Sequence, residues 1–576
     1  MMAGPVRPWP DCDAAMMLAD PATAEDVAAC ERPLFEVFAD IAARQPSHVA
    51  LSDGTACLSY AELRDRALAL GARLAAVVPV DGLVGVLVPT GVLYPVAWLA
   101  CLAARRPLLP LDPHVPPART QAIIAEAGLA AVIVPTTATD FSARLPAGLA
   151  LIPMTGEFEP EPMPLPQGLP PAKVGMVLFT SGSTGRAKGI ALHERSQLRK
   201  ATNYRAACGL GPGDRLLSLH PPSTNGGAGD TLGALLCGAS LHVVDLKGAG
   251  LAGVQTVLRG GITVCVTVPV VMRTLMAMDG AAKALRHVRV LRLGGDTVMG
   301  GDVAGLARML PPTARILVRF GMTESGATLA QRLVDPRAPV ESGPLALDAA
   351  VPGQTISVED AAGKQVAPGE AGELVIRGRY VALGHWVGGK LDAAAFPSDP
   401  SAPGARCYRT GDMVLLRADG MLVPVGRTDR QVKINGTRVE PYEIEAALRG
   451  LPGVMDAAVL VDGDASAPTL VAFVVPAARE HAPEPSAQTA AQLARSWRAT
   501  LAALLPPQQV PAQIRVVPAI PLLPSLKPDL GALRALLATE SAPGVLGRVL
   551  TRLRGSHARG PTARIRPVVR LDGSVP

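Results

Sequence analysis

Short apolar segments alternate with helical patterns along the first 330 residues of the chain. The continuous apolar runs at 83–88 and 263–268 have the length and composition of strands that are covered on both faces. The segment 92–105 has the period of a helix, and Ser59 followed by Glu62 is typical of a capped helix start. This alternation predicts layered α/β structure with largely parallel sheets.

The pattern changes twice in the second half of the chain. After residue 345 short strand patterns replace most helical ones, and from about residue 428 helical and strand patterns mix again. We therefore predict an α/β fold with a loose N-terminal arm (1–30), a large domain of layered α/β subdomains with a β-rich part (31–428), a small, mobile α+β domain (429–537) and a basic tail (538–576).

The composition of the 576-residue chain is that of a globular protein with more than one folding unit. Eight cysteines without a C-x-x-C pair provide neither a disulfide framework nor a zinc site, which favours a reducing, cytoplasmic setting. The apolar stretch near 91–104 ends at Arg105 and is too short to span a membrane. We expect neither a signal peptide nor a membrane anchor.

The net charge of +6 is concentrated at the C-terminal end. Seven arginines and a single acid, Asp572, lie within 541–576, so the remaining residues sum to zero. A neutral body does not resemble a dedicated nucleic-acid-binding protein, which carries its basic surface on a fold. The tail could steer an acidic partner, although a solvated tail without a partner is the simpler interpretation.

A glycine-rich loop follows the apolar run at 174–179. Glycines let backbone N–H groups approach a polyanion, hydroxyls add donors and a lysine adds positive charge. The loop lacks the Walker A pattern, because no Ser or Thr follows Lys188. A flexible loop without a ligand is the alternative, yet Lys188 is one of nine lysines beside 46 arginines. The predicted phosphate-binding residues are Thr180, Ser181, Gly182, Ser183, Thr184, Gly185 and Lys188.

Together, five segments resemble motifs of the adenylate-forming superfamily, which includes acyl-CoA synthetases, luciferases and adenylation domains of nonribosomal peptide synthetases. They occur in the order of that family, at 180–189, 293–296, 319–325, 408–412 and 426–438. The likeness runs from about residue 34 to 535 and is greatest to stand-alone adenylation enzymes of the peptide-synthetase type. Ala187 replaces the usual proline of the loop, which relaxes the backbone without removing a donor.

The resemblance implies a site for ATP. Phe320 would stack on the adenine, next to Gly295 and Asp296. Asp412 and Arg427 would bind the ribose hydroxyls.

The resemblance also implies the groups that act on the phosphates. Thr323 would bond the α-phosphate, and Glu324 would hold Mg²⁺, a cation that accepts one carboxylate together with phosphate oxygens. Lys527 would be the catalytic lysine. Its surroundings depart from the family, because no Asn-Gly precedes it and Pro528 restricts its backbone to an extended geometry. An ordinary surface lysine is the alternative.

The implied reaction has two halves. A carboxylic acid attacks ATP and yields an acyl-adenylate and pyrophosphate, and a thiol then takes the acyl group. The small domain would act as a lid that swings at Asp429, withdraws Lys527 and admits the thiol. Gly436 would lie on the loop that lines the tunnel of the thiol. We therefore expect Lys527→Ala to lose adenylate formation but to retain thioester formation from a supplied adenylate.

The predicted pocket for the acid contains His220, Asn225, Asp230 and Gly294. Peptide-synthetase domains offer an aspartate to the α-ammonium of an amino acid, whereas the matching position is Asn225. A neutral amide cannot pair with an ammonium as a carboxylate does. Either Asp230 takes that role or the substrate is not a standard α-amino acid. For His220, the alternative to a contact with the substrate is a purely structural role.

The acceptor is expected to be the phosphopantetheine thiol of a separate carrier protein, because residues 541–576 contain no Gly-Gly-x-Ser site and are too few for a carrier domain. Two alternatives remain open at this point. One is an acyl-CoA ligase that uses free CoA, and the other is a catalytically degenerate paralogue that serves as a binding or scaffold subunit.

Overall fold

The structure is a computed structural model that describes residues 30–136, 141, 144–155, 173–180, 188–326, 328–341, 343–348, 354–400, 402–427, 432–434, 436–463, 467–477, 486–521 and 528–540. Several predicted features lie outside these residues: the arm 1–29, the tail 541–576, Ser181, Gly182, Ser183, Thr184, Gly185, Asp429 and Lys527.

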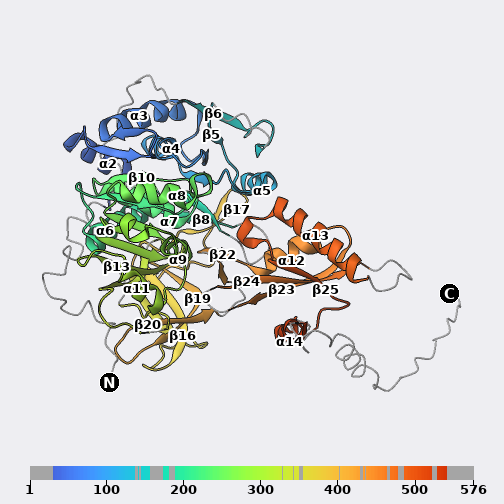
Figure 1. Ribbon diagram of the computed structural model, residues 1–576. Helices are drawn as coiled ribbons and strands as arrows, with labels where there is room; N and C mark the ends of the chain where they lie inside the picture. The colour runs from blue at the N-terminus through green and yellow to red at the C-terminus, as the bar shows by residue number, and fades with distance from the viewer. Residues whose placement is uncertain are drawn as a thin grey trace, which may run out of the picture.

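The first large sheet begins in the N-terminal part of the chain (blue in Figure 1). Its core strands pair in parallel, as their continuous apolar runs predicted, and β7 and β8 add an antiparallel hairpin. In sheet order the strands are β18 (Lys390–Asp392), β17 (Gly384–Val387), β8 (Lys188–Leu192), β7 (Met176–Thr180), β4 (Leu108–Leu111), β3 (Val84–Leu87), β5 (Ala131–Pro135) and β6 (Ala150–Met154).

The second large sheet is parallel except at its two edges. Its strands run in the order β14 (Thr328–Val334), β13 (Arg315–Gly321), β12 (Val290–Gly294), β11 (Val264–Thr267), β9 (Arg215–Ser218), β10 (Ser240–Val243), β1 (Val49–Ser52) and β2 (Cys57–Ser59). The antiparallel edge pair β13–β14 places a turn directly at the end of β13, where the 319–325 motif lies.

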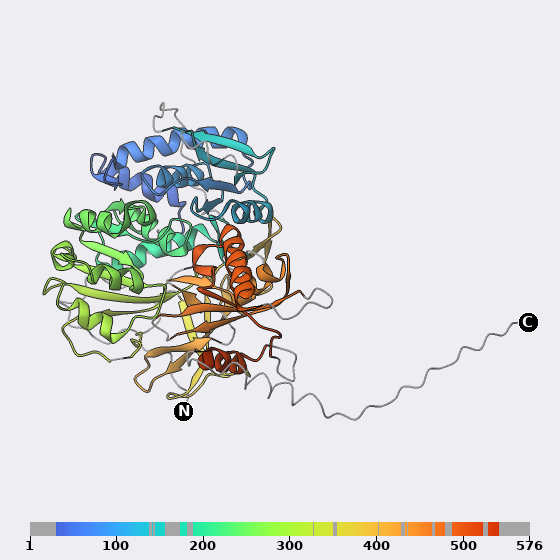
Figure 2. The ribbon, with the colours of Figure 1, turned by 45° about the vertical axis from the view of Figure 1, so that its right-hand side comes forward.

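Helices cover both large sheets (Figure 2). Ser59 and Glu62 form the predicted capping box of α3. Tyr94 of α4 donates to or accepts from Thr231 of α7 at 2.9 Å, which joins the helices of the two layers. The helices are α2 (Leu34–Arg44), α3 (Tyr60–Val77), α4 (Leu93–Ala103), α5 (Pro117–Ala127), α6 (Glu194–Cys208), α7 (Asn225–Leu236), α8 (Leu246–Arg259), α9 (Pro269–Met276), α10 (Ala281–Leu285) and α11 (Gly300–Leu306).

The β-rich part predicted after residue 345 is an antiparallel four-stranded sheet. Its strands are β15 (Gln354–Glu359), β16 (Ala371–Gly378), β19 (Arg406–Leu416) and β20 (Leu422–Arg427). A short hairpin of β21 (Val432–Ile434) and β22 (Thr437–Val439) follows β20 along the chain.

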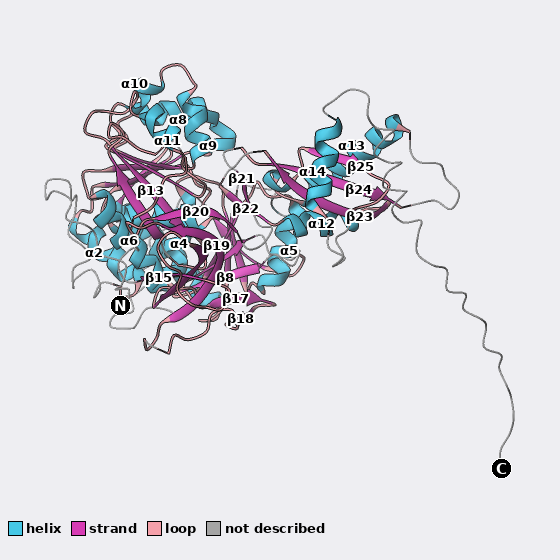
Figure 3. Cartoon of the chain, turned by 90° about the horizontal axis from the view of Figure 1, so that it is seen from below, coloured by secondary structure: helices cyan, strands magenta, loops and turns pink. Residues whose placement is uncertain are grey.

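The C-terminal part forms a separate body (Figure 3). Its three-stranded sheet buries alternate residues on both faces, with Trp497 and Leu501 on one face and Leu533 on the other. The elements are α12 (Pro441–Arg449), β23 (Val454–Asp462), β24 (Thr469–Pro476), α13 (Ala487–Leu504), η2 (Pro507–Gln509), β25 (Gln513–Val516) and α14 (Leu530–Glu540). The mixed α/β class and the smaller C-terminal unit agree with the prediction from the sequence.

Among the helices that the structure describes, none combines the length and the hydropathy that a membrane span requires.

Candidate functional site

A pocket lies where the parallel strands β12 and β13 end. Ligands of open parallel sheets bind at this edge, because the loops that follow the strands meet there. Gly295 has a φ of +84°, a conformation that suits glycine, and it leads the chain into Asp296. Burial raises the pKa of Asp296, against the opposing effect of nearby Lys433. The pocket is lined by Gly295, Asp296, Thr297, Val298, Val318, Arg319, Phe320, Leu345, Leu347, Pro424 and Lys433.

The ring of Phe320 forms part of this pocket, as the resemblance implied. Lys433 of β21 lies over it, with Nζ 5.0 Å from the ring centroid, which is a cation–π geometry. The hairpin β21–β22 therefore reaches the pocket from the C-terminal side of the chain. A flat aromatic ring beside a lysine suits a base with attached phosphates.

Asp412 and Arg427 face each other across the β19–β20 ladder and form an ion pair. Arg427 also donates to the carbonyl of Thr410 at 3.2 Å, and Thr410 Oγ1 accepts the backbone N–H of Asp412 at 3.0 Å. Asp412 Oδ2 is buried without a hydrogen-bond partner among the described residues. Such an acceptor requires a donor, and a ribose hydroxyl would supply one.

The predicted Thr323 and Glu324 occupy the turn between β13 and β14. Gly326 donates its N–H to the carbonyl of Thr323 at 3.0 Å, and its φ is +68°. A Cβ at Gly326 would lie 2.0 Å from the carbonyl oxygen of Tyr380, so only glycine fits. The turn holds Glu324 in a buried position, 2% exposed.

The donor set around Glu324 fits Mg²⁺ rather than a metal with a protein-only ligand shell. No cluster of three or more His, Cys, Asp or Glu side chains that could hold a metal occurs in the described parts of the chain. A cation there would depend on phosphate oxygens and on the single carboxylate of Glu324, an arrangement that Mg²⁺ accepts.

The two ends of the glycine-rich loop pair with each other. Thr180 at the end of β7 lies opposite Lys188 at the start of β8 in the antiparallel ladder. The hairpin therefore brings Lys188 next to the loop 181–187, which itself lies outside the described residues.

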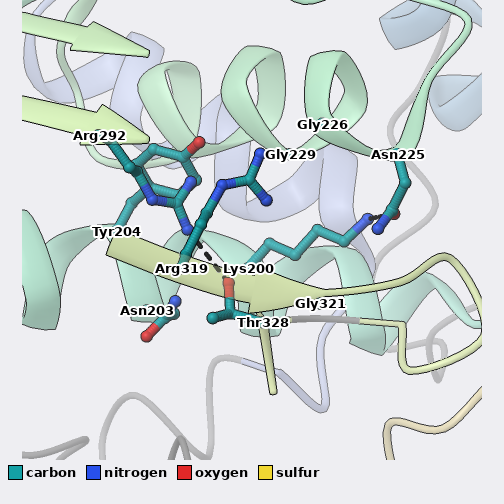
Figure 4. Close-up of a pocket in the computed structure, with 10 residues that line it drawn as sticks. All are labelled: Lys200, Asn203, Tyr204, Asn225, Gly226, Gly229, Arg292, Arg319, Gly321 and Thr328. Atoms are coloured by element: carbon teal, nitrogen blue, oxygen red, sulfur yellow. Dashed lines mark hydrogen bonds between the residues drawn. The ribbon is translucent and has the colours of Figure 1, made fainter. Parts of the chain in front are cut away.

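A second pocket lies on the other side of β13 (Figure 4). Side chains from α6, β12 and β13 enter it, and the glycines at the start of α7 form one wall. It is lined by Lys200, Asn203, Tyr204, Asn225, Gly226, Gly229, Arg292, Arg319, Gly321 and Thr328.

Asn225 connects this pocket to the turn of Thr323 and Glu324. Its Nδ2 donates to the carbonyl of Met322 at 3.1 Å, and its Oδ1 accepts from Lys200 Nζ at 2.6 Å. An aspartate could accept from Lys200 but could not donate to the carbonyl. Both sides of the amide are therefore in use, which accounts for an asparagine at this position.

Asp230 is fully buried behind the pocket and does not line it. Its carboxylate accepts hydrogen bonds from the Tyr204 hydroxyl, from Ser218 Oγ at 2.6 Å and from His220 Nδ1 at 2.7 Å. Burial alone would raise its pKa, but His220 and the nearby arginines hold the pKa well below its usual range. Asp230 and His220 thus form a buried pair joined through Oδ2 and Nδ1, while His220 Nε2 is buried without a hydrogen-bond partner among the described residues.

Three cationic side chains reach the pocket. Arg292 lies over the ring of Tyr204 at 3.9 Å and donates to Thr328 Oγ1 at 3.1 Å. Burial and the neighbouring Arg292 lower the pKa of Arg319. Burial, Arg319 and Arg292 lower the pKa of Lys200 to about 7. No hydrogen bond of the Arg319 guanidinium to another described residue is present, and its Nε is buried.

Gly294 has an indirect role in this pocket. A Cβ at Gly294 would lie 2.5 Å from Cγ of Arg319 and 2.9 Å from its carbonyl oxygen. The missing side chain therefore leaves room for Arg319 to enter the pocket from the adjacent strand. Of the four residues predicted for the acid, Asn225 lines the pocket, Gly294 makes room in it, and Asp230 and His220 lie behind it.

The sequence analysis did not identify Lys200, Arg292 or Arg319 as site residues. Lys200 and Arg292 lie outside the five motif segments, and Arg319 is the first residue of the 319–325 motif but was given no role there. The scarcity of lysine was a usable signal, since Lys200 is one of nine lysines in the chain.

The C-terminal body contacts the large domain near the first pocket. A Cβ at Gly436, whose φ is +75°, would lie 2.6 Å from Val268, and Gly436 also faces Gly295. Farther out, Arg119 of α5 pairs with the buried Glu443 of α12 at 2.6 Å. The residue predicted for the thiol tunnel thus lies against the loop of the nucleotide pocket.

Comparison with known proteins identifies the family of the chain. The family model described as AMP-binding enzyme matches residues 38–386, and that described as AMP-binding enzyme C-terminal domain matches residues 443–527. CymA of Salinispora arenicola, whose name describes a nonribosomal peptide synthetase, is 34% identical over 519 residues, 87% of this chain and 6% of CymA. Malpinin synthetase of Mortierella alpina is 31% identical over 517 residues, 87% of this chain and 7% of that protein.

The chain therefore spans only a small part of these curated relatives. Among solved structures, a nonribosomal peptide synthetase protein with adenylation and PCP domains, bound to a vinylsulfonamide inhibitor, is similar with a TM-score of 0.72. It is 25% identical, and the match covers 88% of this chain and 85% of that one. The chain belongs to the AMP-binding enzyme family, the adenylate-forming enzymes that its motifs resemble.

Proposed function

We propose that the protein activates a carboxylic acid with ATP and passes the acyl group to a thiol. A carboxylate oxygen of the acid attacks the α-phosphorus of ATP, the bond from that phosphorus to the bridging oxygen breaks, and pyrophosphate leaves with the electron pair. A thiolate then attacks the acyl carbon of the acyl-adenylate, the bond from that carbon to the phosphate oxygen breaks, and AMP leaves as the thioester forms.

The observation that carries this proposal is the position of Arg319 between two pockets. It lines the pocket of Phe320 and Asp296 and also the pocket of Lys200 and Asn225. Two ligands bound on either side of β13 would meet at the end of this strand, next to Thr323 and Glu324. Such placement of two anionic reactants is the main task of a phosphoryl-type transfer site.

The residues around the pocket of Phe320 divide the binding of ATP among them. Phe320 would stack on the adenine, while Asp412 and Arg427 would hold the ribose, with Asp412 Oδ2 accepting a hydrogen bond from a ribose hydroxyl. Thr323 and Lys188 would donate to phosphate oxygens. Glu324 would hold Mg²⁺, which neutralises phosphate charge when it is bound.

The acceptor is proposed to be the phosphopantetheine thiol of a carrier protein. The support is the likeness to a structure whose title gives adenylation and PCP domains. The position of Gly436 at the nucleotide pocket also suits the thiol-transfer half, because it sets this loop beside the place where an adenylate would form. Lys527 would act in the first half of the reaction, from a different lid position.

Substrate-dependent ATP–pyrophosphate exchange with a panel of aliphatic, aryl, hydroxy and amino acids tests the activity. We expect exchange with one class of acid and none without acid. Absence of exchange with every acid, together with absence of ATP binding, would leave the degenerate paralogue as the better account. Product analysis with CoA and with a holo carrier protein separates the two acceptors, and preference for CoA would overturn the carrier assignment.

A further inference from the structure

We propose that the acid activated by this protein carries a second anionic group, a carboxylate that Lys200, Arg292 and Arg319 bind in the pocket beside Asn225. The substrate class is therefore a short dicarboxylic acid without an α-ammonium group. This inference rests on the proposed adenylating function and specifies its substrate.

The charges around the pocket do not balance without a ligand. The lining contributes two arginines and a lysine but no carboxylate. The nearest acid, Asp230, lies behind the wall and already accepts from Tyr204, Ser218 and His220. Its oxygen is 3.9 Å from Arg292 Nη1, so it compensates one arginine in part. Buried cations in excess of buried anions are costly unless a ligand pairs with them.

Arg319 is the group most available to a ligand. Its side chain extends from β13 toward the glycines of α7, between Arg292 on one side and Lys200 on the other (Figure 4). Gly229 has only Lys200 near its missing Cβ, at 3.4 Å, so the wall of α7 has no side chain that would fill this space. A planar guanidinium whose N–H groups make no hydrogen bond to another described residue is suited to a carboxylate, which it can bind through two parallel hydrogen bonds.

The same arrangement disfavours an α-amino acid. Lys200 Nζ donates to Asn225 Oδ1 at 2.6 Å. The amine of Lys200 therefore already occupies the position in which a substrate ammonium would pair with an aspartate at residue 225. An incoming ammonium would face Lys200, Arg292 and Arg319 without a carboxylate among the lining residues. Like charges that are in contact within one buried site repel each other strongly.

The state of Lys200 supports this assignment. Burial and the two arginines lower its pKa to about 7, while Asp230 acts in the opposite direction. The charged groups that face it are Asp230 from α7, Arg292 from β12 and Arg319 from β13, and Tyr204 lies one turn along α6. A bound carboxylate would restore the charged form, so binding above neutral pH would be coupled to proton uptake.

The first test is exchange with matched acids. Malonate, succinate and glutarate are each compared with the monoacid of the same carbon number, with the half-amide and, for succinate, with aspartate. We expect one diacid to exceed its monoacid, its half-amide and its 2-amino analogue by about 100-fold in kcat/KM. A monoacid or an amino acid that exceeds every diacid would overturn the inference while leaving the adenylating function intact.

The second test does not depend on turnover. Isothermal titration of the full-length protein with the same diacids, without ATP, should show binding with uptake of up to one proton at about pH 8, read from buffers of different ionisation enthalpy. Absence of diacid binding in a protein that binds ATP in a separate titration would refute the pocket assignment. Absence of ATP binding and of exchange would instead count against the proposed function.

Variants locate the effect. Arg319→Gln and Arg292→Gln should lower kcat/KM for the diacid by about 30-fold or more but that for the half-amide by about 3-fold or less, so the ratio of the two substrates falls. Arg315→Gln is the matched control, because it lies on the same strand but pairs with Asp335 at 3.5 Å, outside the pocket. An unchanged ratio in Arg319→Gln, with an unchanged melting curve, would contradict the proposal.

Discussion

The two pockets on either side of β13 are built in different ways. The nucleotide pocket consists of contiguous motif segments, such as Gly295–Asp296 at the end of β12 and the Asp412–Arg427 pair on adjacent strands. The acid pocket consists of single side chains from α6, α7, β12, β13 and β14. The first pocket uses backbone turns that only certain sequences form, whereas the second uses exchangeable side chains on fixed elements.

This difference separates what the backbone determines from what single side chains determine. Turns that approach a phosphate or a base need glycine at defined positions and tolerate little change. Side chains that project from regular elements into a pocket can differ in charge without altering the backbone. The cationic lining of this pocket is therefore set by individual side chains and not by the course of the backbone.

The largest expected effect comes from the nucleotide side. Asp412→Asn should lower kcat/KM for ATP by about 100- to 1,000-fold, because Arg427 then remains buried without its charge partner and the ribose loses an acceptor. Diacid binding without ATP should remain unchanged. Asp419→Asn is the control, since Asp419 pairs with Arg417 at an exposed position on the same hairpin. Equal loss in both ligands would show that Asp412 acts on the whole site and not on the nucleotide alone.

A pH dependence distinguishes the acid pocket. In the window between a folded pKa of about 7 and the ordinary value of 10.5, the unfolded chain binds a proton at Lys200 that the folded chain does not. The free energy of unfolding should therefore rise with pH in this window, by about 3 kcal/mol up to pH 9. Below pH 7 the folded protein carries the full energetic cost of burying the charged Lys200. Lys200→Met should remove this dependence in denaturant titrations. An identical pH profile for both proteins would exclude the assignment.

A smaller effect should change the selectivity of the acid pocket. Asn225→Asp places a carboxylate beside Lys200 and removes the donor to Met322. The preference for the diacid over its half-amide should fall about 10-fold, and the 2-amino analogue should be accepted better, because the added charge pairs with an ammonium. The KM for ATP should change by about 3-fold or less. Unaltered selectivity would show that Asn225 does not contact the acid.

The smallest effect concerns neither pocket directly. Arg119→Ala breaks the contact between α5 and the buried Glu443 of α12 and should weaken the lid position in which Gly436 lies at the nucleotide loop. Thioester formation from a supplied adenylate should slow about 5-fold relative to adenylate formation. Arg449→Ala, which breaks an ion pair with Asp456 within the C-terminal body, should leave this ratio unchanged. Equal slowing of both halves would count against a role of this ion pair in holding the lid.

The sequence predicted the fold, and it named more of the residues that meet in the pocket of Phe320 than of those that line the pocket of Lys200. Apolar runs such as 83–88 became central parallel strands because burial on both faces leaves a clear pattern. Helix α6 shows why the rest was missed. Its sequence is polar and has no apolar period, which is typical of a surface, yet Ser196, Gln197 and Lys200 are buried. Only tertiary partners, such as Asn225 for Lys200, reveal that the helix is the wall of a pocket.

Arg319 gives the two substrates a common energetic partner. Because the guanidinium of Arg319 borders both pockets, an acid that binds it changes the binding free energy of the nucleotide. The nucleotide changes the binding free energy of the acid by the same amount. For a non-reactive analogue of ATP, the ratio of its dissociation constants with and without the acid must therefore equal the ratio of the acid's dissociation constants with and without the same analogue. A single side chain would in this way set the cooperativity of the ternary complex.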